Sequence, residues 1–380
     1  MGRKATVGAV ALAVLVMVAA AIGALIVKDW LHDTDVLMFG GGPTSAKLID
    51  ERVGKVDPGS LGLSGDVLLR SKGDGGLYVQ DLDAADRPAV KLFDALVVRG
   101  VSPDGRHVVA WRSGGHYRIV RLSDLRAVGE IRGGTSVFLD PNRVLVVFEG
   151  EQCTRRDAVI LDLQQRTVSR LPLSGPRERF LPVGVVEGDV VGQRQGLGDS
   201  GCRDTGAAML DLDDGRVKTV TTEGTVSAVA SRHVWVDDVI QAKERQTRVL
   251  GPDGTVVASG PPLLAEAVGS DVVYAQEPAH VALGEPPSGE STILRVAPGG
   301  VPRADDRFGA EVVDLQSLTA TVDGKAVLAV QRGFDRREGE RSAAVHLCSV
   351  PDLKCRRLAD ISGDLPKTTN VVSAGVFGAG

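Results

Sequence analysis

The chain has 380 residues, of which 44 are Lys or Arg and 49 are Asp or Glu, giving a formal net charge of −5. Hydrophobic residues make up 43%, which is enough for a packed core and excludes a disordered chain. The slightly acidic balance excludes nucleic acid as an expected partner, because nucleic-acid-binding proteins carry a basic face. At about 150 residues per domain, the length alone allows two or three domains.

The N-terminus carries an apolar run over residues 5–27 that contains no charged side chain. About 20 such residues cross the hydrocarbon core of a membrane as a helix. Arg3 and Lys4 precede the run, and a basic flank stays on the cytoplasmic side. We therefore expect residues 1–28 to be a signal anchor in the cell membrane, with the remainder of the chain extracytoplasmic.

A cleavable signal peptide is the alternative interpretation of this run. Small residues at Ala20, Ala21 and Ala24 offer a cleavage site, and cleavage would yield a secreted protein. The apolar region of a signal peptide normally has about 7–15 residues, which is shorter than this run. The length therefore favours an uncleaved anchor.

Beyond about residue 60, the sequence is typical of β-structure. Short runs of Val, Leu and Ile alternate with polar residues, and turn signals separate them every 8–12 residues or so. Asp-Gly pairs suit the positive φ angles of tight hairpins. Such pairs occur at Asp74-Gly75, Asp104-Gly105, Asp214-Gly215, Asp253-Gly254 and Asp323-Gly324. We expect an all-β domain without helices after the anchor.

One pattern recurs along this domain, an apolar strand followed by a turn. Its equivalent apolar positions are Leu82, Leu122, Leu163, Leu212, Leu250, Val296 and Val350. A four-stranded propeller blade needs about 40–45 residues, which is close to the spacing of these positions. The repeat predicts a single β-propeller of about seven blades, with six to eight possible, over residues 59–380. Residues 29–58 are then a spacer.

Two blades carry a family resemblance. Residues 101–125, VSPDGRHVVAWRSGGHYRIVRLSDL, resemble the TolB-type, WD-like propeller repeat, in which a Ser-Pro-Asp-Gly turn leads into two apolar strands. Residues 67–83 are similar to the second half of that unit, and the other blades match it only in pattern. The Gly-His and Trp-Asp marks of WD repeats are missing. The resemblance implies a propeller used for protein docking or as a cover on a peptidase, and the fold does not choose between these uses.

The four cysteines predict two disulfides, since an even count in an exported chain is typical of paired cysteines. Zinc binding is the alternative, but no CxxC and no His at ligand spacing is present. Cys153 and Cys202 each lie ten residues before the repeat position of their blade, so we expect a bridge between blades three and four. Cys348 and Cys355 flank a turn and are expected to pair across the last hairpin.

Two short motifs resemble catalytic or metal-binding sequences. Gly198–Gly201, GDSG, resembles the nucleophile segment of chymotrypsin-like proteases, but no His occurs in the context which that chemistry needs. Asp211–Gly215 resembles the start of a calcium loop, but position twelve is Thr222 rather than Glu. Both are predicted to be hairpin turns, and no metal, cofactor or catalytic residue is assigned.

A charged segment of the last blade is the candidate docking rim. Long loops on a rigid scaffold are where binding groups collect. The segment from Glu277 to Glu290 is a second candidate rim element. The rim residues are Arg332, Arg336, Arg337 and Arg341.

Ring closure is predicted at the C-terminus, because Thr369–Phe377 reads as a strand that can be the innermost strand of blade one. With no catalytic constellation assembled, we expect a non-enzymatic interaction or scaffold module at the cell surface, binding a protein or a cell-envelope component. A propeller hydrolase or lyase and a small-ligand sensor, each using the central channel, are the alternatives. A deep pocket lined by Arg and carboxylates would favour an enzyme.

Overall fold

The computed structural model describes residues 37–39, 44–71, 74–82, 84, 87–113, 116–198, 201–240, 244–260, 263–276, 291–303, 307–313, 315–334, 341–362 and 369–377. The chain divides into two compact units, Met1–Leu37 and Met38–Gly380. The membrane helix predicted for residues 5–27 lies outside the described residues. Within the described ranges, no helix has the length and apolarity that a membrane crossing requires.

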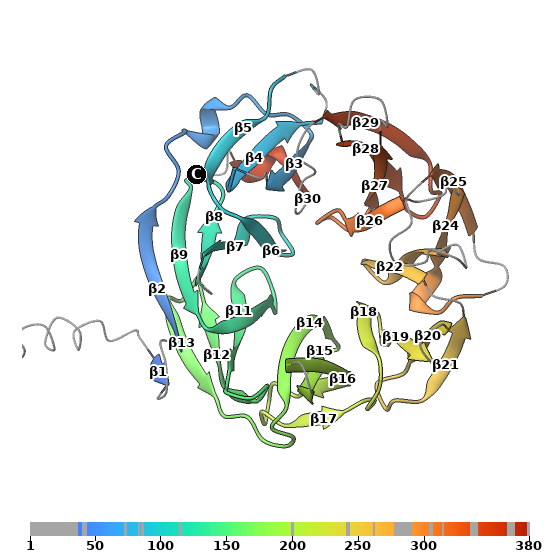
Figure 1. Cartoon of the computed structure of the whole chain (residues 1–380). Coiled ribbons are helices and arrows are strands. Elements are labelled where there is room, and N and C mark those ends of the chain that lie inside the picture. The colour runs from blue at the N-terminus through green and yellow to red at the C-terminus, as the bar shows by residue number, and fades with distance from the viewer. Residues whose placement is uncertain are drawn as a thin grey trace, which may run out of the picture. The chain divides into compact units, whose positions relative to one another are not determined.

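The second unit contains seven antiparallel sheets arranged around a central axis as the blades of a propeller (Figure 1). From the axis outward, blade one contains β30 (Thr369–Ser373), β3 (Asp66–Ser71), β4 (Gly76–Asp81) and β5 (Val90–Asp94). Blade two contains β6 (Val97–Val101), β7 (His107–Ser113), β8 (His116–Arg121), β9 (Arg126–Arg132), β2 (Thr44–Arg52) and β1 (Leu37–Phe39). Blade three contains β10 (Gly134–Phe138), β11 (Arg143–Glu149), β12 (Arg155–Asp162) and β13 (Thr167–Leu171).

The remaining blades follow the same order. Blade four contains β14 (Arg179–Val186), β15 (Asp189–Gly198), β16 (Gly201–Leu210) and β17 (Val217–Thr219). Blade five contains β18 (Thr225–Ala230), β19 (His233–Ile240), β20 (Glu244–Leu250) and β21 (Val256–Gly260). Blade six contains β22 (Leu263–Val268), β23 (Asp271–Gln276), β24 (Ser291–Ala297) and β25 (Arg307–Val313). Blade seven contains β26 (Leu315–Ala320), β27 (Ala326–Phe334), β28 (Arg341–Ser349) and β29 (Cys355–Ser362).

The seven-blade prediction is confirmed, and the structure explains the repeat that led to it. Each of the seven repeat positions lies within two residues of the end of its blade's third strand. Helical structure in the described residues is limited to the short 3₁₀ turns η1 (Pro58–Ser60), η3 (Pro298–Gly300) and η4 (Ala374–Phe377). The cores lie between neighbouring blades, where alternate side chains of the inner strands pack from both sides.

Ring closure occurs as predicted. β30 pairs with β3 and is the innermost strand of blade one, so the two ends of the domain complete the same sheet. Val371 also forms a bridge with Thr321 of blade seven. Val372 and Phe377 are buried in the core that joins blades one and two. The closing strand therefore contributes to the apolar cores on both of its sides.

The Ser-Pro-Asp-Gly turn of blade two has a counterpart in blade seven. Ser102 Oγ donates to Asp104 Oδ1 at 2.7 Å and accepts from the backbone N–H of His107 at 2.9 Å. Thr321 makes the same bonds in blade seven, at 2.7 Å to Asp323 Oδ1 and 3.0 Å from the N–H of Ala326. The hydroxyl thus satisfies the first N–H of the second strand in both blades.

The spacer predicted for residues 29–58 contains a strand of the propeller, which corrects the predicted domain boundary. β2 pairs with β9, the fourth strand of blade two, and also contacts blade three. Ala46 and Leu48 are buried, whereas the intervening residues carry polar side chains. β2 lies between β9 and the short outer strand β1, and its second face keeps mostly charged side chains. This composition resembles that of a linker.

Candidate functional site

Every blade has the same antiparallel strand order. The connections between the second and third strands therefore lie on one face of the propeller, together with the connections between successive blades. We call this face the hairpin face. In blades three to five its described residues are 150–154, 172–178 and 220–224, together with the ends of β15 and β16. Of the predicted docking rim, Arg332 lies on β27 and Arg341 opens β28, so the end of β27 and the start of β28 lie on this face. Arg336, Arg337 and residues 277–290 lie outside the described residues, and the rim stays a prediction.

Both predicted disulfides are present. Cys153 lies in the β11–β12 connection of blade three and is bonded to Cys202, the second residue of β16 in blade four, with a Cα–Cα distance of 5.4 Å. Cys348 and Cys355 face each other in the β28–β29 pair of blade seven and are bonded. The first bridge therefore joins two blades at the hairpin face, and the second stabilises the last hairpin.

An ion pair lies beside the first disulfide. Arg179, which opens β14, donates through Nη2 to Glu149 at the end of β11 in blade three. Its Nη1 lies 3.9 Å from Cys202 Sγ, and its backbone N–H donates to the carbonyl of Cys153 at 2.7 Å. The seam between blades three and four is therefore closed by a covalent bond, an ion pair and a backbone bond within a few residues.

A buried amide closes the seam between blades four and five. Gln193 of β15 donates through Nε2 to the carbonyls of Gly206 at 2.9 Å and Gly224 at 3.2 Å. Its Oε1 accepts from the backbone N–H of Val226 at 2.6 Å. Gly224 and Val226 belong to the start of blade five, so one side chain of blade four satisfies backbone groups of its neighbour. Buried backbone groups of this kind would otherwise cost free energy.

Two arginines extend this network. The buried Arg194 pairs with Glu178 at 2.9 Å and donates to the carbonyl of Thr221 at 3.3 Å. Arg248 of blade five pairs with Asp238 at 3.0 Å and donates to Thr221 Oγ1 at 3.4 Å. Thr221, in the connection between blades four and five, is therefore shared by both guanidinium groups. A row of paired charges extends across blades three to five on the hairpin face.

The β15–β16 hairpin carries the exposed part of this face. Its strands are the longest of the described residues, at ten residues each, and pair as far as Gly198 and Gly201. The first and last residues of the GDSG segment are therefore a strand pair, whereas Asp199 and Ser200 lie outside the described residues. Leu197 is 63% exposed at this end, opposite Cys202. Arg177 and Arg203 are exposed here without an ion-pair partner among the described residues.

A lone carboxyl group lies between blades six and seven. Glu266 of β22 is half-buried, and its Oε1 accepts from the backbone N–H of Ala320 of β26 at 3.1 Å. Burial raises the pKa of Glu266 to about 7, although this hydrogen bond opposes the shift. The corresponding positions, two residues before the end of the inner strand, are Ala228 in blade five and Gly184 in blade four. No sequence motif marks Glu266, because its environment depends on Ala320, which is far away along the chain.

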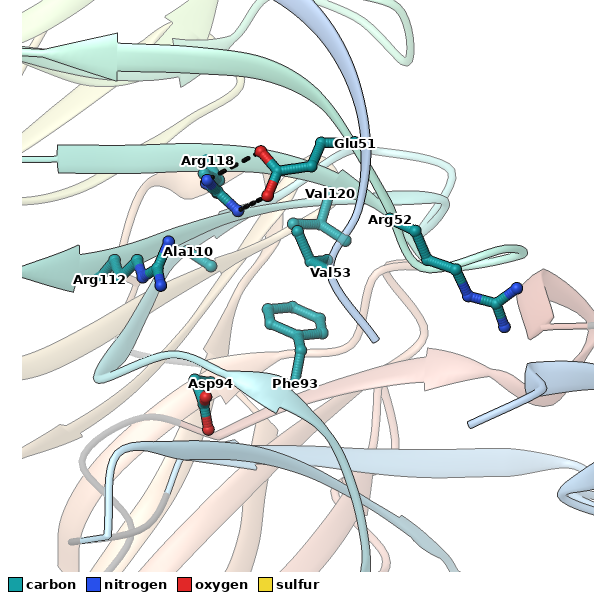
Figure 2. Close-up of a pocket in the computed structure, with 9 residues that line it drawn as sticks. All are labelled: Glu51, Arg52, Val53, Phe93, Asp94, Ala110, Arg112, Arg118 and Val120. Carbon is teal, nitrogen blue, oxygen red and sulfur yellow. Dashed lines mark hydrogen bonds and ion pairs between the residues drawn. The ribbon is translucent and has the colours of Figure 1, made fainter. Parts of the chain in front are cut away.

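A small cleft of about 140 Å³ lies between blades one and two (Figure 2). Its apolar wall includes the buried side chains of Phe93 and Val120. Arg118 binds Glu51 through two bonds, at 3.2 and 3.0 Å, across the mouth. The remaining lining residues are Arg52, Val53, Asp94, Ala110 and Arg112.

The Asp211 turn and two of the histidines, His107 and His233, are held by contacts within the described part of the fold. Asp211 Oδ1 accepts from the N–H of Asp213 at 2.9 Å, which is the predicted hairpin turn. No group of three or more His, Cys, Asp or Glu side chains is placed to hold a metal ion in the described part of the chain. His107 is buried, and burial lowers its pKa. His233 Nδ1 lies 3.0 Å from the carbonyl of Gly299.

No family model and no curated protein matches this chain. The β-propeller domain of the Trilobed protease from Pyrococcus furiosus is 12% identical, with a TM-score of 0.49 over 83% of this chain and 98% of that chain. The dihydro-heme d1 dehydrogenase NirN is 16% identical, with a TM-score of 0.46 over 86% and 78%. BamB from Moraxella catarrhalis is 13% identical, with a TM-score of 0.40 over 71% and 80%. These similarities concern the propeller fold, and the TolB-type resemblance stays a prediction.

Proposed function

We propose that the chain is a non-enzymatic interaction module that docks a protein or a cell-envelope component through the hairpin face. The observation that supports this function is that the charged and amide side chains at the seams of blades three to five pair with one another. A surface whose polar groups are already fixed loses little conformational entropy when a partner binds. The disulfide between Cys153 and Cys202 adds to this rigidity.

The proposed contact centre is the end of the β15–β16 hairpin. Leu197 offers an exposed apolar side chain, and Arg177 and Arg203 offer charges that are not used within the described structure. Apolar and Arg side chains are favoured in the buried core of a protein interface, whereas paired charges are typical of its polar rim. Two arginines of the predicted rim, Arg332 on β27 and Arg341 at the start of β28, belong to the same face.

The two disulfides support an oxidising, extracytoplasmic location, because such bonds persist in those compartments. We propose that residues 1–28 remain as an uncleaved anchor, so that the module acts at the membrane surface with its N-terminus in the cytoplasm. Cleavage of this segment would instead yield a secreted module. Mass spectrometry of the N-terminus of the mature protein distinguishes the two forms.

Site-specific photocross-linking in the native cells tests the docking function. A photoreactive residue replaces Leu197 on the hairpin face, and the matched control replaces Val256, which is 54% exposed on the outer strand of blade five. We expect a discrete adduct from position 197 that is absent from position 256. Adding Arg203→Glu to the position-197 variant is expected to abolish the adduct. Equal adducts from both positions, or none from position 197, would contradict the proposal.

A further inference from the structure

The cleft between blades one and two holds a guanidinium group that the described structure leaves unused. Arg112, near the end of β7, is exposed and has no ion pair or hydrogen bond among the described residues. Figure 2 shows it extending toward the cavity beside Arg118, whereas Arg52 points away. Arg112 is therefore available to a ligand that enters the cleft.

The other charged groups of the cleft already have partners. Both carboxylate oxygens of Glu51 accept from Arg118. Asp94 pairs with Lys91 at 2.8 Å, and its pKa is lowered, first by this hydrogen bond and also by the charge of Arg112. Arg52 donates to the carbonyl of Gly54 at 3.1 Å. Arg52 points away from the cavity (Figure 2), so Arg112 is the cation that faces the cleft without a carboxylate partner among the described residues. This single charge suits a ligand with one negative charge.

The size and the wall of the cleft restrict the ligand further. The cleft is small, at about 140 Å³, so it suits the end of a side chain or a short acid. Phe93, Val120 and the half-buried Val53 form an apolar surface beside the guanidinium. The nearby carboxylates of Glu51 and Asp94 would repel a phosphate dianion more strongly than a carboxylate, which carries one negative charge. A carboxylate also matches the planar guanidinium group of Arg112 through two parallel hydrogen bonds.

We propose that this cleft is a binding site for a carboxylate on a short apolar stem, held by Arg112 and packed on Phe93 and Val53. The site lies between blades one and two, away from the proposed contact centre at the β15–β16 hairpin, and does not depend on the docking function. The carboxylate comes either from a peptide, as a Glu side chain or a C-terminus, or from a free short-chain acid. Arg112 supplies the charge in each case.

Titration of the full-length chain with butyrate, monitored by ligand-observed NMR, tests the site. We expect saturable binding of butyrate, and no binding of butyramide, which has nearly the same shape without the charge. Arg112→Gln is expected to weaken butyrate binding at least about tenfold, since a charged two-bond contact is lost. Arg112 has no partner in the described structure, so this variant keeps the fold. Arg216→Gln, at an exposed arginine in the Asp211 turn of blade four, is the matched control and is expected to bind as the wild type does.

Two further probes identify the source of the carboxylate. N-acetylglutamate α-amide presents a side-chain carboxylate, and N-acetylleucine presents a C-terminal one. Binding tighter than that of butyrate by either compound, lost in Arg112→Gln, assigns the site to peptides of that kind, and preference for butyrate assigns it to free acids. Failure of all three carboxylates to bind, or equal binding to the wild type and Arg112→Gln, would overturn the proposal.

Discussion

The seam between blades three and four and the seam between blades six and seven occupy equivalent places in the ring but are held by different interactions. The first combines a disulfide with the ion pair of Arg179 and Glu149. Both seams contain an apolar core. In the second, which includes Val268 and Leu318, Glu266 adds a carboxyl group that has no ion-pair partner among the described residues and accepts from one backbone N–H. Paired polar groups therefore reinforce the seam where a docking face is proposed, whereas the described part of the seam between blades six and seven depends mainly on apolar packing.

This difference has a consequence for stability. A paired or fully hydrogen-bonded group makes a seam specific and rigid, and removing one partner leaves the other unsatisfied. An apolar seam depends on buried area instead, and a half-buried carboxyl group within it makes its stability depend on pH. We therefore expect the two regions to respond differently to truncation, reduction and pH.

The largest effect is expected from removing the closing strand. Deleting residues 366–380 removes β30, together with the buried side chains of Val371, Val372, Val376 and Phe377. At about 1.5–3 kcal/mol each, their loss amounts to about 6–12 kcal/mol, which is comparable with the whole stability of a typical domain. Calorimetry should show no cooperative transition. Deleting only residues 378–380 is the control, and an unchanged melting temperature in the longer deletion would contradict the closure.

The two disulfides differ in the length of chain that they enclose. Cys153–Cys202 spans 49 residues and Cys348–Cys355 spans 7. In the chain-entropy model these bridges contribute about 4 and about 2 kcal/mol respectively. Denaturant unfolding of the paired Ser variants should therefore show the greater loss for the bridge between blades three and four. An equal loss, or the reverse order, would show that the first bridge does not hold the seam.

The third prediction concerns the amide that joins blades four and five. Gln193→Ala leaves the carbonyl of Gly224 and the N–H of Val226 without their partner, at an expected cost of about 2–4 kcal/mol. The control is Gln195→Ala on the same strand, whose side chain bonds only to Asp204 at an exposed position. That variant should lose less than about 0.5 kcal/mol. Equal urea midpoints for the two variants would rule out a special role for Gln193.

The smallest effect is the pH dependence at the apolar seam. The carboxyl of Glu266 has a pKa of about 7 when folded, against an ordinary value of 4.5, so the folded state holds the proton more tightly. Its contribution is therefore greatest below about pH 4.5, and about 2–3 kcal/mol of stability is lost as the pH rises to about 7. Glu266→Gln should remove this loss. If both proteins show the same difference in stability between pH 5 and pH 8, Glu266 is not the titrating group.

Much of the fold could be predicted because its signals are local or repeat at a fixed period. Asp-Gly turns and the recurrent third strand established the blade number, and the shared position of Cys153 and Cys202 within that repeat predicted their bond. The strand β2 was assigned to a spacer because only Thr44, Ala46 and Leu48 are buried along it. Three small or apolar residues among charged ones do not give a clear strand pattern.

The candidate sites could not be predicted in the same way, because their members are far apart in the sequence. Gln193 meets Gly224 only after blades four and five have formed, and Glu266 meets Ala320 only across a seam. The cleft of Figure 2 requires the N-terminal strand to place Glu51 against Arg118. Unlike the disulfide of Cys153 and Cys202, these polar contacts between blades leave no period or motif in the sequence.

The central claim is that a partner binds the hairpin face at blades three to five. Hydrogen exchange of the full-length chain, measured with and without the partner identified by cross-linking, tests it most directly. The claim predicts slower exchange in the β15–β16 hairpin and in residues 150–154, with the turn at Asp211–Gly215 on the opposite face unchanged. Protection confined to that opposite face, or to the inner strands that surround the axis, would contradict it.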